Sequence, residues 1–489
     1  MPKKLINSSV VLNVIGGLLL IMGVLMLTSI CFSIYYHENL LPILLSSGIT
    51  LCVGGALKYF TKSSKDAEIK KREGYLIVTF SWISMGVFAT LPYLLSGAIP
   101  TVTNAFFESM SGLSTTGASI LDNIEELPKG ILFWRSMTQW LGGMGIIVLT
   151  IAILPMLGIG GMELFVAEAP GPTKDKIHPR IKETAKRLWI IYLGLTVAET
   201  IILMFAGMNF YDAINHSLTT NSTGGFSTKQ DSIAFFDSAL IEYIIVFFMF
   251  FAGTNFTLLY FALKGKFKKI LKNDEFKWYL FAVIGLIIIL GPIIYYNNTS
   301  GYDLGRSYRA ATFQTVSIIT TTGYASGDFT TWGPLAEFVF FLLLFSGASA
   351  GSTSGGIKIV RIVLLMKNGF LEFKRRLHPN AVIPVHLNKE PVSNIIIYNL
   401  LAFIFLYLFI YTIGALLMTA FGVDLLESLS TVATSLGNVG PGIGDYGPSH
   451  SFSTLPSPAK WLLSFLMLFG RLELFTVALI LTPYFWKRN

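Results

Sequence analysis

The chain has 489 residues, of which 53% are hydrophobic and only 13% are charged, and its mean hydropathy is +0.63. A water-soluble domain cannot bury that much apolar surface, so the composition excludes a soluble globular fold and makes the lipid bilayer the solvent for most of the chain. The formal net charge of +8 would suit a nucleic-acid partner, but the distribution of the basic residues argues against one.

Ten predominantly apolar stretches follow one another along the chain and predict an all-α polytopic membrane protein. Each is close to the roughly 20 residues that a helix needs to cross the hydrocarbon core, apart from the eighth, which is interrupted. The first is too long for the apolar part of a signal peptide, so we expect a retained helix. The stretches are 10–34, 40–60, 75–96, 131–157, 188–208, 239–263, 276–296, 335–345 with 357–366, 392–421 and 461–485.

Basic residues gather in alternate connections between these stretches. Segments 62–72, 174–187, 264–277 and 358–376 hold 23 of the 36 Lys and Arg. The intervening loops are instead acidic, with Asp122, Glu125, Glu126, Asp231, Asp237 and Asp445. This positive-inside bias predicts that both termini and the basic loops are cytoplasmic, and it accounts for the net charge without nucleic acid.

Four short segments interrupt the spanning pattern and resemble one another. Each starts with about three helical turns of mixed polarity, ends in a glycine-centred tetrapeptide, and lies on the side poor in positive charge. Their glycines are spaced 108, 98 and 117 residues apart, at Gly117, Gly225, Gly323 and Gly440. The repetition predicts two N-terminal helices (1–70) and four helix–loop–helix units, at 72–160, 181–265, 275–378 and 390–486.

Such loops have a defined chemistry at membrane depth. Non-helical backbone is tolerated there only where it is buried in protein or lines a water-filled cavity. A cation that loses its hydration shell needs a ring of oxygens, which backbone carbonyls supply without a fixed charge. Glycine readily adopts the backbone angles that turn successive carbonyls inward. Four loops of one chain can therefore close a ring around one axis.

The pieces STTGA, STGGFST, TTTGY and LGNVGPG resemble the four filter loops of the Trk/Ktr/HKT potassium transporters. The resemblance runs from about residue 70 to the C-terminus, and the two extra N-terminal helices make the chain most similar to the TrkH branch. It implies that K⁺ is the transported ion, that backbone carbonyls coordinate it, and that no organic cofactor is needed. The implied potassium ligands are Thr115, Thr116, Gly117, Thr223, Gly224, Gly225, Thr321, Thr322, Gly323, Asn438, Val439 and Gly440.

Two of the loops depart from this pattern. In the fourth loop, Asn438 and Val439 replace the threonine pair, so its side chains contribute differently. In the second loop, Gly224 and Gly225 compete for the filter position, and we favour Gly225 because a phenylalanine follows it. Ordinary turn glycines in outer loops are the alternative, which four repeats in register disfavour.

The third unit contains a segment, 346–356, in which every residue is Gly, Ala, Ser or Thr. Its poor helix propensity in mid-crossing predicts an unwound break. The resemblance implies that this segment lies under the filter and obstructs the pore. The implied gate residues are Gly347, Gly351, Ser352, Thr353, Ser354, Gly355 and Gly356. The alternative is the small-residue packing face of a continuous helix.

Arg471 stands near the centre of the last apolar stretch, where an arginine costs about 2.5–3.5 kcal/mol on insertion scales. The resemblance implies that it projects into the cavity below the filter; the alternative is a buried ion pair with Glu199. Glu108 and Glu427 either attract cations at the pore mouth or cap the N-termini of their helices. We favour capping. His216 is expected to pack rather than to bind an ion.

We therefore expect gated potassium permeation. The alternative, a carrier coupling K⁺ to Na⁺ or H⁺, needs coupling carboxylates, and we expect few buried ones, chiefly Glu199 and Glu473. An intramembrane enzyme is disfavoured because the chain shows no nucleophile, metal pair or catalytic dyad. The resemblance further implies a homodimer in the lipid of the bacterial cytoplasmic (inner) membrane, regulated by cytoplasmic TrkA-like nucleotide-binding subunits.

Overall fold

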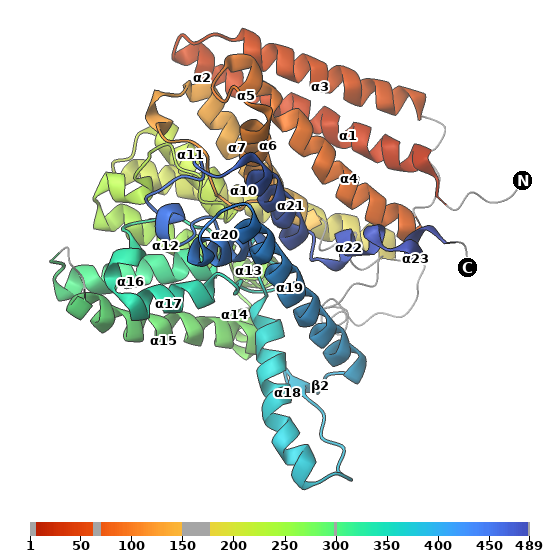
Figure 1. The fold of residues 1–489 in the computed structure, drawn as a ribbon, viewed down its shortest axis with the longest axis vertical. Helices are drawn as coiled ribbons and strands as arrows, with labels where there is room; N and C mark the ends of the chain where they lie inside the picture. The colour runs from red at the N-terminus through yellow and green to blue at the C-terminus, as the bar shows by residue number, and fades with distance from the viewer. Residues whose placement is uncertain (1–5, 62–69, 149–176, 298–300, 488–489) are drawn as a thin grey trace, which may run out of the picture.

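The computed structural model describes residues 6–61, 70–148, 177–297 and 301–487, which form a bundle of helices (Figure 1). Six helices among them are long and apolar enough to cross a membrane, and eight spans result if each of two bent helix pairs counts as one. The predicted all-α membrane fold is confirmed. Parts of two predicted cytoplasmic segments, 62–72 and 174–187, and the end of the predicted first unit lie outside the described residues.

The N-terminal helices form a tightly packed pair. Gly16 and Gly54 lie where the two helices touch, and a Cβ atom on either would come within 2.9 Å of the other's carbonyl oxygen. Small residues are what allow helix backbones to approach this closely in a membrane. The elements are α1 (Ser8–Met26), η1 (Leu27–Ser29), α2 (Ile30–Tyr35) and α3 (Leu41–Phe60).

The next helices are grouped by the units that the sequence predicts. The first predicted unit contains α4 (Lys71–Ala89), α5 (Leu91–Ser96), α6 (Val102–Leu113), η3 (Ile124–Glu126) and α7 (Lys129–Val148). The second contains α10 (Ile177–Phe205), α11 (Phe210–Asn221), η6 (Ser232–Phe236), α12 (Ala239–Ala252) and α13 (Phe256–Leu263), and α14 (Phe267–Lys272) follows it.

The remaining elements complete the bundle. The third predicted unit contains α15 (Asp274–Asn297), α16 (Leu304–Ile319), η7 (Phe329–Trp332), α17 (Pro334–Leu343) and α18 (Ile359–Leu377). A small antiparallel ladder, β1 (His386–Leu387) and β2 (Glu390–Pro391), leads to the fourth. The fourth contains α19 (Asn394–Ala420), α20 (Leu425–Gly437), η8 (Gly444–Tyr446), α21 (Ser457–Arg471), α22 (Phe475–Leu481) and α23 (Pro483–Trp486).

Two stretches that the sequence predicts as continuous crossings, 239–263 and 461–485, are sharply bent, so that expectation is wrong. The pair α12 and α13 bends by 107°, and the pair α21 and α22 by 117°. At the first bend, the Asn255 side chain accepts a hydrogen bond from a backbone N–H of α13 and so starts a new helix. At the second, Glu473 and Leu474 take positive φ angles of 58° and 51°, which end the first helix.

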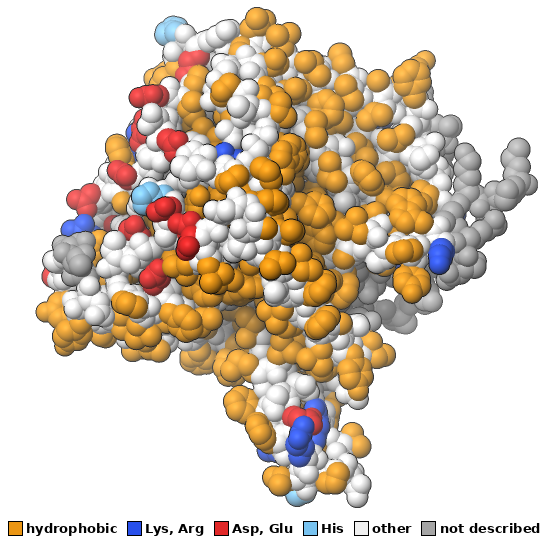
Figure 2. Space-filling model, viewed as in Figure 1, with side chains coloured by type: hydrophobic (Ala, Val, Ile, Leu, Met, Phe, Trp, Pro, Cys, Tyr) orange, Lys and Arg blue, Asp and Glu red, His pale blue; other side chains and the backbone are white. Residues whose placement is uncertain are grey.

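The molecular surface fits a lipid environment. Figure 2 shows a broad hydrophobic surface over the middle of the bundle, with acidic side chains gathered at the edge that lies away from the termini marked in Figure 1. Large apolar side chains such as Phe60 and Phe205 are 82% and 89% exposed in the isolated chain. A soluble protein rarely exposes so continuous an apolar surface. Helix α18 projects from the bundle beside one end of α19 (Figure 1).

Candidate functional site

The short helices α6, α11, α16 and α20 end in the same backbone turn. Near each helix end one residue takes a left-handed conformation, and a glycine two positions later also has a positive φ. The left-handed residues are Thr115, Thr223, Thr321 and Asn438, with φ of 53°, 55°, 58° and 54°. The glycines are Gly117, Gly225, Gly323 and Gly440, with φ of 87°, 77°, 80° and 118°. Because the same turn occurs at four places far apart in the sequence, it is a repeated structural motif of the fold.

Hydrogen bonds of the same kind hold all four turns. The N–H of the residue between the left-handed residue and the glycine donates to the carbonyl five positions earlier, at 2.8–3.0 Å. This bond is typical of a helix that ends through a left-handed residue. Three of those residues are threonines, and a β-branched side chain at positive φ is strained by roughly 1–3 kcal/mol. Such strain persists only where the surroundings enforce it, and it concentrates at functional sites.

The shared turn aligns the four loops residue by residue. Gly225 stands at the position of Gly117 and Gly323, whereas Gly224 aligns with Thr116 and Thr322. The backbone register therefore favours Gly225 as the repeated glycine, which is the choice made from the sequence.

The four loops contact one another in a closed ring. A Cβ atom added to each glycine would meet a carbonyl oxygen of the next loop along the chain, and the last loop would meet the first. The contacts are Gly117 with Gly224, Gly225 with Thr322, Gly323 with Val439, and Gly440 with Thr116. A side chain at any of the four positions therefore requires the ring to move apart.

The side chain of Asn438 helps to close this ring. Its amide nitrogen donates to Thr116 Oγ1 at 3.0 Å and to the carbonyl oxygen of Met467 on α21 at 2.9 Å. Where the other loops have threonine, the fourth loop thus has a side chain that joins it to the first loop. All four glycines also line one pocket of about 70 Å³, whose wall continues through the residues that follow them, such as Ser119 and Pro441.

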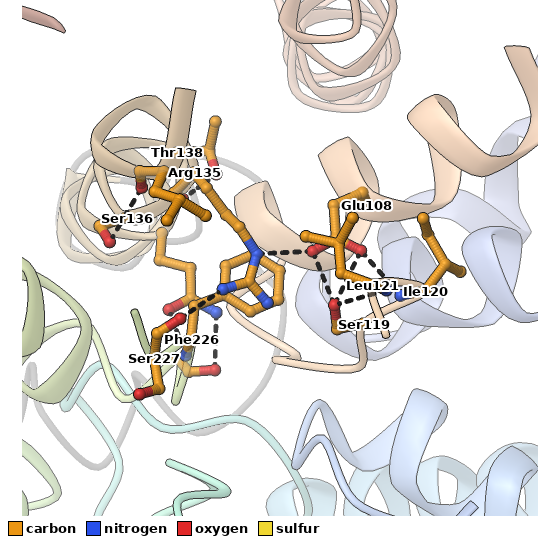
Figure 3. Close-up of polar contacts among 12 residues, drawn as sticks. Glu108, Ser119, Ile120, Leu121, Arg135, Ser136, Thr138, Phe226 and Ser227 are labelled. Carbon is orange, nitrogen blue, oxygen red and sulfur yellow. Dashed lines mark hydrogen bonds and ion pairs between the residues drawn. The ribbon is translucent and has the colours of Figure 1, made fainter. Parts of the chain in front are cut away.

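A buried ion pair joins the first short helix to the second loop (Figure 3). Arg135 of α7 contacts Glu108 of α6, with 2.6 Å between Nε and Oε1, and neither side chain is more than 3% exposed. The guanidinium also donates to the Ser227 carbonyl at 2.8 Å and lies 3.6 Å from the ring centroid of Phe226. Charge pairing of this kind keeps a buried carboxylate compensated.

Neither expectation for Glu108 is correct. Its carboxylate accepts from Ser119 Oγ and from the Ile120 N–H, each at 3.0 Å, so it points into protein rather than into the pocket (Figure 3). Thr101, not Glu108, is the N-cap of α6. Asp424 precedes α20 in the same way, and Glu427 instead accepts weakly from the Asp445 N–H at 3.4 Å, so capping by Glu427 is also wrong.

Two further polar side chains hold the second loop. Gln139, one turn beyond Arg135 on α7, donates from Nε2 to the Gly224 carbonyl at 2.6 Å and accepts from the Phe226 N–H at 3.0 Å. His216 lies 2.9 Å from Ser227 Oγ through Nε2 and 2.7 Å from a backbone carbonyl of α11 through Nδ1. Both ring nitrogens are thus occupied within the protein, and His216 has the packing environment that was expected.

Residues 344–358, between α17 and α18, form no helix and lie against the ends of the short helices. The Gly355 N–H donates to Thr321 Oγ1 at 2.7 Å, and Thr353 Oγ1 donates to the Asn221 carbonyl at 3.1 Å. A Cβ atom on Gly355 would collide with the Gly437 carbonyl oxygen. These contacts involve residues that precede the ring glycines, whereas the pocket is lined by residues at and after them. The segment therefore lies beneath the ring, opposite the pocket.

The α12–α13 bend and α15 anchor this segment. The Ser349 N–H donates to the Gly253 carbonyl at 3.0 Å, and the Phe256 N–H donates to the Gly351 carbonyl at 3.1 Å. Glu275 at the start of α15 accepts from the Ala350 N–H at 2.6 Å. The bend thus exposes backbone groups that a straight helix would use internally.

Two basic side chains also hold the segment. Arg471 is only 2% exposed, and its two terminal nitrogens donate to the carbonyls of Thr353 at 2.8 Å and Gly142 at 3.0 Å. Lys358 donates to the carbonyls of Ser354 and Gly355. Both cations therefore satisfy backbone oxygens of a segment that has no helical bonds of its own.

The alternative considered for Arg471, an ion pair with a carboxylate such as Glu199, is wrong. Glu199 instead accepts from Asn221 Nδ2 at 2.6 Å, and Glu473 pairs with Arg361. The expectation of few buried carboxylates is also wrong, because Glu73, Glu108, Glu242 and Glu275 are at most 6% exposed.

Sequence reasoning missed Arg135 and Gln139. They stand four residues apart within the predicted stretch 131–157, so they share one helix face. Arg135, like Arg471, lies within an apolar stretch, and an intramembrane arginine marks a functional position, so its signal is present in the sequence. Gln139 carries no comparable signal, because its role depends on which loop packs against α7.

Comparisons with known proteins agree with this fold. The TrkH family model, described as a cation transport protein, matches residues 42–487. The chain is 41% identical to the Trk system potassium uptake protein TrkH of Halomonas elongata, over 98% of this chain and 99% of that protein. It is 42% identical to the Escherichia coli protein of that name, over 90% and 91%. The crystal structure of the potassium transporter TrkH from Vibrio parahaemolyticus superposes with a TM-score of 0.90 at 38% identity, covering 98% of this chain and 100% of that one.

Proposed function

The chain belongs to the TrkH family of cation transport proteins, and from that premise we propose that it takes up potassium across the cytoplasmic membrane through the ring of glycine loops. It is a multi-pass membrane transporter rather than an enzyme. The curated relatives are named as potassium uptake proteins of the Trk system, which makes K⁺ the first ion to test.

The closed ring of four loops is the observation that carries this proposal. Four glycines at positive φ, each against a carbonyl of the next loop, bring backbone oxygens from four directions around one axis. Backbone carbonyls can replace the hydration shell of K⁺ without a fixed charge. We assign K⁺ coordination to the backbone carbonyls of the aligned residues, which are those at 115–117, 223–225, 321–323 and 438–440. The four helix–loop–helix units hold these loops in position.

The segment beneath the ring is the proposed gate. It contacts residues before the ring glycines, and Arg471 and Lys358 place positive charge on its carbonyls. A cation leaving the ring on that side meets both backbone and positive charge. Moving the segment aside requires the breaking of a limited set of hydrogen bonds, so its position can be controlled.

A carrier coupled to Na⁺ or H⁺ has less support. Coupling needs a carboxylate that is free to change its charge or partner during transport. Glu108 and Glu242 are paired with Arg135 and Arg309, at 2.6 and 3.2 Å, and Glu275 holds the backbone of Ala350. Of the two candidates named from the sequence, Glu199 accepts from Asn221 Nδ2 at 2.6 Å and Glu473 pairs with Arg361. These carboxylates make contacts within the protein, which favours gated permeation.

We further propose the surroundings that the resemblance implies. The basic segments and both termini face the cytoplasm, and the apolar surface of Figure 2 contacts lipid. Two copies form a homodimer, and a cytoplasmic nucleotide-binding subunit of the TrkA kind acts on the gate. Helix α18 follows the proposed gate directly and projects from the bundle, so a partner that binds α18 can move the gate.

The test is transport by the protein itself. We expect growth rescue of potassium-uptake-deficient cells at low external K⁺, and K⁺ flux into proteoliposomes that exceeds Na⁺ flux. Equal K⁺ and Na⁺ fluxes in proteoliposomes, with and without cytoplasmic partners, would refute the proposed filter.

A further inference from the structure

The residue before the ring glycine differs between the loops. In the first and third loops it is threonine, and its hydroxyl bonds to a hydroxyl two positions earlier. Thr116 Oγ1 lies 2.7 Å from Ser114 Oγ, and Thr322 Oγ1 lies 2.8 Å from Thr320 Oγ1. In the second loop the aligned residue is Gly224, which has no side chain to make this contact.

The side chain of Gln139 occupies the space that the missing threonine leaves. A Cβ atom on Gly224 would lie 2.8 Å from Nε2 of Gln139 and would collide with the rest of its carboxamide. Gln139 is fully buried, and both polar atoms of its amide are bonded to the second loop. The two bonded groups, the Gly224 carbonyl and the Phe226 N–H, lie on either side of Gly225. The amide therefore fixes both peptide planes that flank the ring glycine.

We propose that Gln139 is a positioning residue that replaces, from α7, the threonine side chain absent from the second loop. This inference rests on the proposed filter and adds to it a determinant of selectivity on a different helix. Each loop must present its carbonyls at a set distance for the ring to prefer one cation over another. Loss of the amide allows the Gly225 peptides to rotate, and the ring then fits a smaller or partly hydrated ion equally well.

The second loop retains the partner that a threonine needs. Ser222 stands where Ser114 and Thr320 stand in the other two loops. The φ of Gly224 lies outside the left-handed region, so a side chain there is compatible with the backbone. The three atoms nearest to an added Cβ at position 224 all belong to Gln139, so Gln139 is the first obstacle to a threonine there. We therefore expect two combinations to support the same loop: glycine at 224 with glutamine at 139, or threonine at 224 with a small residue at 139.

A double-mutant cycle tests this exchange. K⁺ and Na⁺ fluxes are measured in proteoliposomes that contain equal amounts of folded full-length Gln139→Ala, Gly224→Thr, the double variant and the unmodified protein. The loss of two buried hydrogen bonds predicts a fall in the K⁺/Na⁺ flux ratio of roughly tenfold for Gln139→Ala. Gly224→Thr lowers the ratio as well, through its clash with Gln139. The double variant recovers a ratio within about twofold of the original, because the introduced threonine then fills the space and can reach Ser222.

A more conservative variant keeps the test decisive if Gln139→Ala does not fold. Gln139→Met preserves the length of the side chain but loses both hydrogen bonds to the second loop, so the flux ratio falls. The matched control is Ser136→Ala on the same helix, whose hydroxyl bonds only to its own helix at Leu132, and its ratio stays unchanged.

Gly323→Ser separates this inference from the proposed function. A changed ratio for Gly323→Ser together with unchanged ratios for Gln139→Met and Gln139→Ala would overturn the role of Gln139 alone. Unchanged ratios for Gly323→Ser and for the serine variants of the other three ring glycines would overturn the filter on which that role rests. A double variant no better than the worse single variant would show that Gln139 does not replace the threonine.

Discussion

The glycine ring and the segment beneath it are both non-helical backbone buried inside one bundle, yet they are built in opposite ways. Each ring turn is held by a backbone bond to a residue five positions away, and that turn occurs four times. The segment 344–358 occurs once, and residues far away in the chain hold it, such as Arg471 and Glu275. A repeated local turn gives a fixed geometry, whereas a single segment held by many separate contacts can be released. The difference fits the proposal that the ring selects the ion and that the segment controls its passage.

Removal of the segment should have the largest effect. Deletion of residues 348–354 eliminates the contacts to Gly253, Glu275 and Arg471 together. We expect basal K⁺ flux to rise by about tenfold or more, since a shift of about 1.4 kcal/mol in a closed–open equilibrium is already tenfold. The measurement is K⁺ uptake by proteoliposomes without a regulatory subunit. Unchanged basal flux with equal folded protein would restore the interpretation of the segment as a packing surface.

A substitution in the ring should change selectivity without opening the gate. A side chain in Gly323→Ser collides with the Val439 carbonyl and lies 3.0 Å from Pro441. We expect the K⁺/Na⁺ flux ratio to fall by roughly tenfold, because carbonyl spacing sets ion preference. Gly285→Ser is the control, since a Cβ atom at that glycine meets nothing within 4 Å. The assignment would be contradicted by an altered K⁺/Na⁺ flux ratio in Gly285→Ser. It would also be contradicted if serine at each of the four ring glycines left the ratio unchanged.

Removal of Arg471 tests one anchor of the segment. Arg471→Ala removes a positive charge below the ring and frees the carbonyls of Thr353 and Gly142. We expect K⁺ flux to rise by roughly fivefold, which is less than for the deletion because the other anchors remain, and Arg471→Lys should have a weaker effect. Single-channel or liposome flux per folded molecule is the readout. Reduced expression with unaltered flux per molecule would indicate a structural role only.

Lys358 should have the smallest effect. Lys358→Met keeps the apolar stem and removes the ammonium that bonds the carbonyls of Ser354 and Gly355. We expect about a twofold increase in basal K⁺ flux, because these bonds lie within the segment and its own continuation into α18. Lys358→Arg serves as the control that keeps the charge. A larger effect than that of Arg471→Ala would mean that the segment is held mainly from its C-terminal end.

The same contrast explains what could be predicted from the sequence. The helices and the recurrence of Gly117, Gly225, Gly323 and Gly440 depend on short-range patterns, so the sequence alone predicts them. Partners across the bundle do not follow from such patterns: Arg471 reaches carbonyls 118 and 329 residues away, not Glu199. Gln139 gives no signal until α7 is seen against the second loop.

The bends in the two predicted crossings were missed for a related reason. Both stretches are apolar enough for continuous helices, and hydropathy does not register the local backbone bonds that break them. At the first bend, the backbones of Gly253 and Phe256 form hydrogen bonds with the segment 344–358. Capping by Asn255 and contacts with the segment 344–358 together determine where the first of these helix pairs breaks.

The most direct test combines the two regions in one protein. K⁺ and Na⁺ fluxes are measured in proteoliposomes for the deletion of 348–354, for Gly323→Ser, and for the two changes together. If the ring selects and the segment gates, the deletion raises flux with the K⁺/Na⁺ ratio kept, and the combined protein shows high flux with the lowered ratio of Gly323→Ser alone. A deletion that by itself abolishes the preference for K⁺ would contradict the separation of the two functions.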